Sequence, residues 1–307
     1  MKKIYYPKTY IPKDSNVVAK RMGKYAAIAH NNRKKRECFA RRISKDLYEV
    51  TSTKEQRLYR HTISRSENAQ SLAATANRLH GLVLSNVIDT SKCLGVTVTY
   101  AEIMQDFTKL SRDCTNFRRR LKNLVGSYKY ISVTEFQERG ALHVHFILLF
   151  DHVVSKIDIK RLKKAWNFGS VYLSPIKNAL QLANYLTKNM RDMPLEDAEK
   201  LIGENVNSCS QYVLVDANGN EHTYVKSAGI FLYPTGKNIF SSSRGLKRME
   251  IIKDVRYSDI LDQLGECKQV YRSNVKMFFS DEFDHLYLHD QKEMYQLLSK
   301  DTHDQKH

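Results

Sequence analysis

The sequence has little of several features that define whole classes of protein. Only five Pro and 12 Gly occur in 307 residues, which excludes collagen-like and low-complexity architectures. The five cysteines are scattered, without a CxxC pair, and favour reduced thiols over a disulfide framework or a zinc site. No segment approaches the ~20 apolar residues of a membrane span, and the N-terminus has no signal-peptide-like apolar run. These absences predict a soluble, cytoplasmic protein that does not use a membrane.

The charge is strongly basic and unevenly distributed. Fifty Lys and Arg face 33 Asp and Glu, a net charge of +17 that favours a polyanionic partner, although membranes and acidic proteins also bind basic chains. Residues 1–90 hold 19 basic and 7 acidic residues, with clusters at 33–36 and 41–42 among helix-compatible residues. We therefore expect residues 1–88 to be a basic, mostly helical DNA-binding region, with an amphipathic helix at 64–86; a solvated basic face is the alternative. Residues 251–307 form an acidic C-terminal region of mixed strand and helix.

The middle of the chain alternates strand and helix patterns. Strands are predicted at 94–100, 130–137, 143–150 and about 171–173, and helices at 111–124 and 156–166. The strand at 143–150 is apolar enough for the centre of a sheet. Asn218-Gly219 predicts a hairpin between 211–215 and 221–226. A further helix is expected to begin with Ser174 as its N-cap and Pro175 as its first residue, and to end before Pro194.

His143 and His145 are two residues apart on a predicted strand and therefore project from one face. Two imidazoles on an otherwise apolar strand cost free energy unless they find partners. They are either metal ligands or structural histidines satisfied by hydrogen bonds, and the HxH pattern alone does not separate the two.

The preceding strand offers a third metal ligand. Glu138-Arg139-Gly140 makes a three-residue hairpin loop, which pairs Glu135 with His143 on the same face. A two-residue turn would bring Phe136 there instead, and Gln137 is an alternative outer ligand. Two imidazoles and a carboxylate suit Mg²⁺ or Mn²⁺ acting on a phosphate, although zinc would also bind such a set.

Tyr185 is the candidate nucleophile. On the predicted helix it shares a polar sector with Gln181, Lys188 and Asp192, so Tyr185 and Lys188 can face one ligand together. A phenol with a pKa near 10 needs a cation nearby to act as a nucleophile at neutral pH. By itself a YxxK pattern says little in a chain with 18 tyrosines.

Three motifs in this order resemble the rolling-circle replication initiators of the HUH endonuclease superfamily, encoded by bacterial plasmids and single-stranded DNA phages. The motifs are LGVTVTY at 94–100, EFQERGALHVHF at 135–146 and NYLTK at 184–188. The segment SSRGLK at 242–247 also resembles one that follows the nuclease core in such initiators. The resemblance covers residues 90–250, and no family is matched by residues 1–88 or by the acidic tail.

The resemblance implies an α+β fold of the RRM/ferredoxin-like type, an antiparallel sheet flanked by helices, in a nicking domain at 89–250. It implies that Tyr185 attacks an origin phosphodiester, leaving a 5′-phosphotyrosyl link and a free 3′-OH. His143, His145 and Glu135 would hold the metal, and Lys188 would assist. Gln181 and Asn189 occupy the neighbouring helix turns, so the chain would be of the one-tyrosine type.

The expected DNA contacts away from the reaction centre come from a further basic set: Arg118, Arg119, Arg120, Arg244 and Lys247. Expected partners are origin DNA, single-stranded at the nick, with a host polymerase and helicase in a bacterial cytoplasm. The helicase is expected because the chain has no GxxxxGK[ST] motif. A homodimer is one option. The competing functions are a mobilisation relaxase or transposase with the same chemistry, and a non-catalytic origin-binding regulator.

Overall fold

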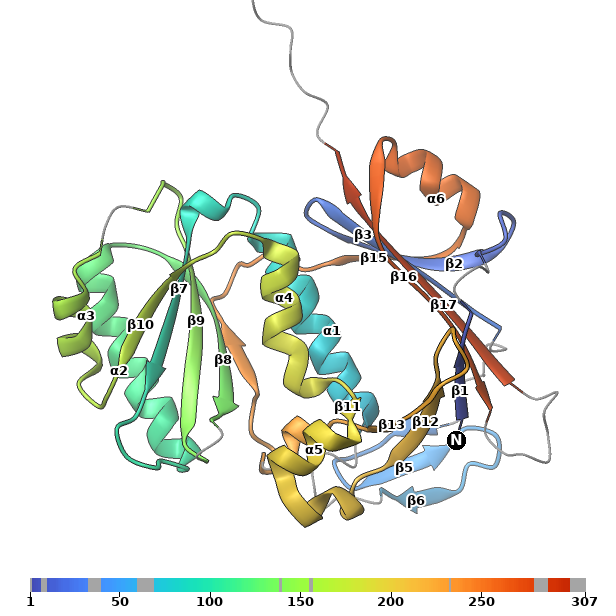
Figure 1. Cartoon of the computed structure of the whole chain (residues 1–307), viewed down its shortest axis with the longest axis horizontal. Helices are drawn as coiled ribbons and strands as arrows, with labels where there is room; N and C mark the ends of the chain where they lie inside the picture. Colours follow the sequence, from blue (N-terminus) through green and yellow to red (C-terminus); the bar gives the residue numbers. More distant parts are fainter. Residues whose placement is uncertain are drawn as a thin grey trace, which may run out of the picture.

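The computed structural model describes residues 2–6, 10–32, 40–59, 69–137, 140–154, 157–231, 233–278 and 287–298. Within these ranges the chain forms three sheets and six α-helices. Two helices separate a five-stranded sheet from a nine-stranded one (Figure 1). The fold is therefore α+β, as the sequence predicts.

The five-stranded sheet is wholly antiparallel, in the order β10-β7-β9-β8-β14. Its strands are β7 (Cys93–Thr99), β8 (Lys129–Phe136), β9 (Leu142–Leu149), β10 (Val171–Pro175) and β14 (Phe240–Ser242). The histidine-bearing strand β9 lies at the centre between β7 and β8. This confirms both the predicted strands and the central place of residues 143–150.

Helices cover both faces of this sheet. Alternate residues of the strands point to opposite faces, so Val144, Phe146 and Leu148 pack in one core with α2 (Phe107–Val125) and α3 (Ile159–Trp166). On the other face Ile147 packs in a core with α1 (Ala69–Asn86) and α4 (Ala179–Thr187). The second face also holds His143 and His145, because they share the alternation of Ile147.

The nine-stranded sheet runs β11-β13-β12-β1-β16-β17-β3-β2-β15. Its strands are β1 (Lys2–Tyr5), β2 (Asn16–Met22), β3 (Tyr25–Asn31), β11 (Met193–Pro194), β12 (Gln211–Val215), β13 (Glu221–Val225), β15 (Glu250–Arg256), β16 (Cys267–Phe278) and β17 (Tyr287–Leu297). All neighbours are antiparallel except β1 and β12. The predicted Asn218-Gly219 hairpin is confirmed as the β12–β13 connection. The sheet unites strands from both ends of the sequence.

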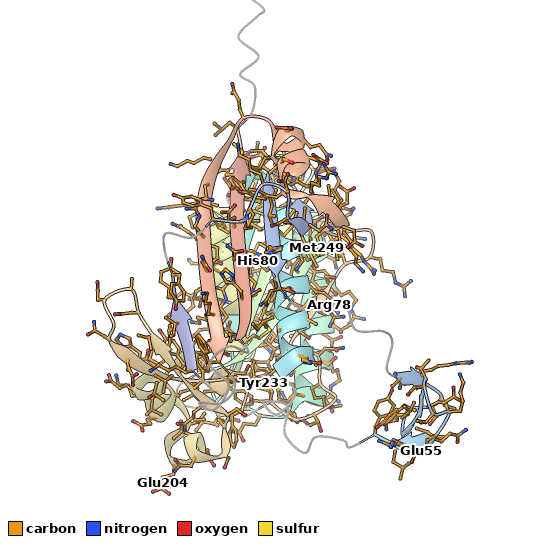
Figure 2. All side chains as sticks on the ribbon, turned by 90° about the vertical axis from the view of Figure 1, so that its right-hand side faces the viewer. Glu55, Arg78, His80, Glu204, Tyr233 and Met249 are labelled. Carbon is orange, nitrogen blue, oxygen red and sulfur yellow. The ribbon has the colours of Figure 1, made fainter. Side chains whose placement is uncertain are left out.

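The smaller elements lie around these layers. They are the three-stranded sheet β4 (Ala40–Arg42), β5 (Leu47–Val50) and β6 (Gln56–Leu58), helices α5 (Leu195–Ile202) and α6 (Tyr257–Leu264), and 3₁₀ helices at Thr90–Lys92, Lys188–Met190, Gly203–Ser208 and Ala228–Ile230. The three-stranded sheet, marked by Glu55, stands away from the two large sheets (Figure 2). None of the helices that the structure describes is long and apolar enough to cross a membrane.

The expectation of a mostly helical N-terminal region is wrong. Residues 2–59, where described, form six strands, and the first helix is α1. Period-two burial along β2, with Val17, Ala19 and Met22 buried, marks a strand. The partners of these strands lie at residues 211–297, a pairing that local composition does not reveal. The basic cluster at 33–36 lies outside the described residues.

Helix α1 belongs to both halves of the molecule. Its residues Leu79, Val83 and Leu84 are fully buried, in a core that also contains Tyr25 of β3 and Met294 of β17. The predicted amphipathic helix is thereby confirmed from residue 69 onward. Gly23, with φ +59°, turns β2 into β3 so close to α1 that an added Cβ would lie 2.5 Å from the Leu84 carbonyl oxygen.

Helix α4 begins later than predicted. Ser174 and Pro175 pair with Gly95 and Leu94 as the end of edge strand β10, where proline's missing N–H is tolerated. The N-cap is Asn178, whose Oδ1 accepts a hydrogen bond from the Gln181 N–H at 3.0 Å. The helix ends at Thr187 and tightens into a 3₁₀ turn, so Asp192 lies beyond it.

Candidate active site

The hairpin of β8 and β9 brings a carboxylate beside the histidines. Glu135 pairs directly with His143, and the Gln137 N–H donates to the Ala141 carbonyl at 2.8 Å. Gly140 has φ +80°, the left-handed conformation that this turn requires. This is the register expected from a three-residue loop, although Glu138 and Arg139 lie outside the described residues.

The three side chains converge on one point. Nε2 of His143 and Nε2 of His145 lie 2.9 Å apart. Oε2 of Glu135 lies 3.5 Å from His143 Nε2 and 3.3 Å from His145 Nε2. Glu135 is 4% exposed. The cluster is therefore largely buried, and its ligand atoms face one another.

This arrangement fits a divalent metal ion. One ligand atom from each residue lies within 4.8 Å of the other two. Among the described residues, Oε1 of Glu135 and Nδ1 of His143 are buried without a hydrogen-bond partner, which is costly for a purely structural cluster. Two imidazoles and one carboxylate form a ligand set suited to a divalent ion with open positions. The cluster could hold a metal ion, and its chemistry leaves the ion's identity open.

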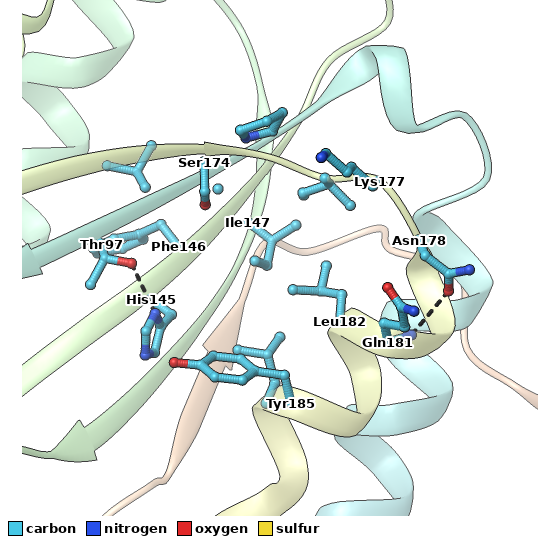
Figure 3. A pocket seen from close by; sticks show the side chains of 15 residues that line it. Thr97, His145, Phe146, Ile147, Ser174, Lys177, Asn178, Gln181, Leu182 and Tyr185 are labelled. Carbon is cyan, nitrogen blue, oxygen red and sulfur yellow. Dashed lines mark hydrogen bonds between the residues drawn. The ribbon is translucent and has the colours of Figure 1, made fainter.

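Thr97 of β7 orients one of the histidines. Its Oγ1 lies 2.9 Å from Nδ1 of His145, on the ring edge opposite the cluster (Figure 3). An imidazole whose Nδ1–H donates to a neighbour presents a lone pair at Nε2, which is the form that binds a metal. The sequence analysis did not identify this residue. The signal was the position of Thr97 in the LGVTVTY strand, directly opposite His145.

The electrostatics of the cluster keep Glu135 ionised. Burial raises the pKa of this carboxyl, but hydrogen bonds from His143 and His145 and the nearby charges of His145 and Lys188 outweigh it and lower the pKa to about 2. The carboxylate is thus available as an anionic ligand at any physiological pH.

Helix α4 places Tyr185 beside the cluster. Ala183 and Leu186 are buried against the core, which turns Tyr185 toward β9. Its ring lies edge-on to that of His145, with centroids 5.4 Å apart, and its side chain is 44% exposed (Figure 3). A phenol that is half exposed and adjacent to a cationic centre can reach a bound phosphodiester.

Lys188 follows one turn later. Its Nζ lies 4.3 Å from the centre of the Tyr185 ring. Burial raises the pKa of the Tyr185 phenol, and the negative charge of Glu135 raises it further. Without added positive charge the phenol is therefore protonated at neutral pH.

A cavity of about 410 Å³ opens next to Tyr185. It lies between β7, β9, β10 and α4 (Figure 3). Its polar lining side chains are Thr97, His145, Ser174, Lys177, Asn178, Gln181 and Tyr185. The remaining walls are apolar. Such a mixed surface can receive a nucleotide next to the reacting phosphate.

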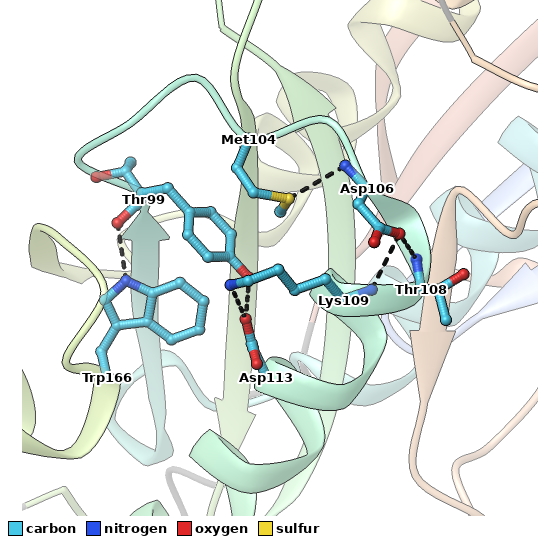
Figure 4. A network of polar contacts seen from close by, with 8 residues as sticks. Thr99, Met104, Asp106, Thr108, Lys109, Asp113 and Trp166 are labelled. Atoms are coloured by element: carbon cyan, nitrogen blue, oxygen red, sulfur yellow. Dashed lines mark hydrogen bonds and ion pairs between the residues drawn. The ribbon is translucent and has the colours of Figure 1, made fainter.

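The end of β7 is fixed by a polar network on the far face of the sheet. Asp113 of α2 accepts hydrogen bonds from the Tyr100 hydroxyl at 2.9 Å and from Lys109 Nζ at 2.8 Å. The Trp166 indole donates to the Thr99 carbonyl at 2.8 Å (Figure 4). These bonds tie the strand that bears Thr97 to α2 and α3.

The structure does not bring Arg118, Arg119 and Arg120 to the cluster. They lie on α2, which covers the opposite face of the five-stranded sheet. Arg118 stacks over the Tyr130 ring at 4.5 Å, and Arg120 donates to the Ala165 carbonyl at 3.0 Å. Two of the three are thus engaged in packing.

Arg244 and Lys247 also lie away from the cluster. Both are exposed on the segment after β14, which pairs with β8 as far as Ile131. Glu135 lies toward the other end of β8. The Lys247 N–H donates to Asn86 Oδ1 at 2.9 Å, so this segment is anchored to the end of α1.

Fold and site together define a candidate metal-dependent phosphodiester site with a tyrosine nucleophile. Residues 93–193 match the family model of the replication-associated protein ORF2. The matched segment runs from β7 to β11 and contains the histidine–glutamate cluster, Tyr185 and Lys188. No curated protein and no solved structure matches the chain. The match covers about a third of the chain and supports a replication initiator.

Proposed function

We propose that the protein nicks one strand of a replication origin through Tyr185, as a rolling-circle initiator of the HUH type with one catalytic tyrosine. The observation that supports this is the position of Tyr185 against His145 of the cluster, within the segment that matches a replication-associated family. The proposal joins a nucleophile, a metal-ligand set and a DNA replication role.

In this reaction the Tyr185 oxygen attacks the phosphorus atom and forms a new O–P bond. The bond from phosphorus to the 3′ oxygen breaks, and that oxygen leaves as a 3′-OH. The phenol loses one proton and the leaving oxygen gains one, so the step is neutral overall. Reversal of the step rejoins the strand, because the phosphotyrosyl link conserves the energy of the phosphodiester.

The side chains divide the work. Glu135, His143 and His145 would hold Mg²⁺ or Mn²⁺, which when bound supplies positive charge at the phosphate and the phenol. Thr97 holds the orientation of His145. Lys188 places its ammonium group near the Tyr185 ring, where it favours the phenolate and offsets charge on the phosphate.

The proposed product also names the partners. A free 3′-OH is the substrate of a host polymerase, and strand displacement from the nick would use a host helicase. Origin DNA, single-stranded at the nick, is the substrate.

The test is incubation of the full chain with circular single-stranded DNA carrying its parent origin and Mn²⁺. A protein–DNA adduct on a denaturing gel, mapped to Tyr185 by mass spectrometry, is the expected result. An adduct on another residue would move the nucleophile. Origin binding without any adduct or nick would favour a non-catalytic regulator, whereas nicking without support of replication from a cloned origin would favour a relaxase or transposase.

A further inference from the structure

One face of the nine-stranded sheet is turned toward α1. Met22, Tyr25 and Met294 project from this face into the core that contains Leu79 of α1. The β2–β3 and β17–β3 registers place Lys20 and Lys292 on the same face, two residues along their strands from Met22 and Met294. This face therefore changes from apolar to basic beside the α1 contact.

Further cations extend this area. Lys3 of β1 stands over the Tyr212 ring at 3.5 Å, and Lys226 lies 6.0 Å from the same ring. From the other side Arg191, just after α4, and His80 of α1 both hydrogen-bond to Asn184 Oδ1, at 2.8 and 3.3 Å. His80 and Arg78 mark this side of α1 in Figure 2. We name as the basic surface Lys3, Lys20, His80, Arg191, Lys226 and Lys292.

Members of the basic surface repel one another. Burial lowers the pKa of Lys20 and the charge of Lys292 lowers it further. Burial also lowers the pKa of His80, to about 4, and the charges of Arg191 and Lys20 contribute. Charges that lower each other's pKa cost free energy in the isolated protein, and a polyanion would recover it.

Few carboxylates compensate this charge. In the described part of the chain Asp192 lies 3.6 Å from Lys3, and Asp290 lies 2.5 Å from Lys292. No described carboxylate lies within 4.0 Å of Lys20, Lys226 or Arg191. Five cations thus face two paired acids.

Exposed aromatic rings accompany the cations. Tyr271 of β16 pairs with Met294, so it projects from the same face, and it is 53% exposed. It is close enough to Arg191 to affect the pKa of that guanidinium. Tyr212 and Tyr224 stack at 5.7 Å next to Lys3 and Lys226. Cations interleaved with exposed rings are typical of surfaces that bind single-stranded nucleic acid, because rings stack on bases and cations contact phosphates.

We propose that the basic surface binds the phosphodiester backbone of single-stranded DNA that leads to Tyr185. Arg191 contacts Asn184, the residue before Tyr185, so the surface begins beside the nucleophile. That the strand is origin DNA rests on the proposed function; binding of single-stranded DNA does not.

The test compares the wild type with the Lys20→Gln/Lys292→Gln variant, using fluorescence anisotropy of a labelled oligo-dT over a salt series. Removal of two phosphate contacts should reduce the slope of log affinity against log salt by about 1.4. Affinity at moderate salt should fall about tenfold. Lys163→Gln/Lys164→Gln on exposed α3 makes the same change in net charge and should leave the slope unchanged.

The outcomes separate this surface from general electrostatics. Equal losses in both variants would show an effect of net charge and overturn the proposal, as would no loss in Lys20→Gln/Lys292→Gln. An equal loss for duplex DNA would overturn the single-strand assignment. Tyr271→Ala should weaken oligo-dT binding about fivefold more than Tyr271→Phe if bases stack on this ring. Absence of nicking in the wild type would leave these binding results intact, so the two proposals fail separately.

Discussion

At Tyr185, burial and the charge of Glu135 act together against ionisation of the hydroxyl. The nucleophile is therefore quiet until positive charge reaches the site. Lys188 alone lies beside the ring rather than at the hydroxyl, so activation depends on what the histidine–glutamate cluster binds.

Tyr185→Phe is expected to abolish nicking and adduct formation while origin binding changes less than about twofold. The side chain is half exposed, so its melting temperature should also change little. Tyr172→Phe, at an exposed tyrosine on β10, is the matched control. An adduct formed by Tyr185→Phe would exclude this residue as the nucleophile.

Thr97→Val should weaken Mn²⁺ binding about tenfold or more, because His145 loses the partner that sets its tautomer. Isothermal titration with Mn²⁺ measures this. Thr115→Val, on the surface of α2, should bind as the wild type does. Unchanged affinity in Thr97→Val would mean that His145 is held by its packing alone.

The residues of the cluster could be predicted because hairpin arithmetic is local. Glu135 follows from the alternation of a strand and from one loop length, both visible in the sequence. Thr97 could not be found in the same way, because its contact with His145 depends on which strand is the neighbour of β9. That neighbour is 48 residues away in the chain.

At the scale of elements, α4 shows where a strong local signal misleads. Ser174-Pro175 has the chemistry of a helix start, but pairing with β7 claims both residues for a strand. Asn178 has an equally suitable side chain and lies where the strand ends. Tertiary pairing decided between two local candidates.

Asn178→Ala should lower the free energy of unfolding by about 1 kcal/mol, since the first turn of α4 loses its cap. Asn178→Asp keeps the acceptor and should be close to the wild type. Ser174→Ala should cost less than Asn178→Ala in the same urea titration. A larger cost for Ser174→Ala would restore the earlier helix start.

Contact between α1 and α4 predicts a dependence of stability on pH. The pKa of His80 is about 4 in the folded protein and near 6.5 when unfolded. Between these values the unfolded chain binds the extra proton, so stability falls as pH decreases from about 6.5 and levels off below about 4. With allowance for partial exposure, the wild type should lose on the order of 2 kcal/mol more than His80→Gln over this range. Parallel curves for the two proteins would contradict this assignment.

At the scale of the whole molecule, the two large sheets share one core through α1. Leu79, Val83 and Leu84 contact residues from both ends of the chain, and the same helix backs α4. The N-terminal strands were not predictable, because their partners are more than 180 residues away.

Residues 89–307 expressed alone should therefore fail to fold, losing cleavage of short single-stranded DNA together with duplex binding. Removal of α1 would expose the buried face of α4 and leave β16 and β17 without β1 and β3. Circular dichroism and a nicking assay on the truncated chain measure this. A folded fragment that still nicks would show that the terminal strands are dispensable to the site.

The strand order also sets when the protein can mature during synthesis. β16 and β17 lie between β1 and β3 but are translated after every residue of the active site. Until residue 297 has left the ribosome, β1 and β3 keep open edges that can pair with other chains. We expect the tyrosine site to reach its final geometry only after translation of this segment. A chain terminated early would then be an aggregation hazard rather than a partly active nuclease.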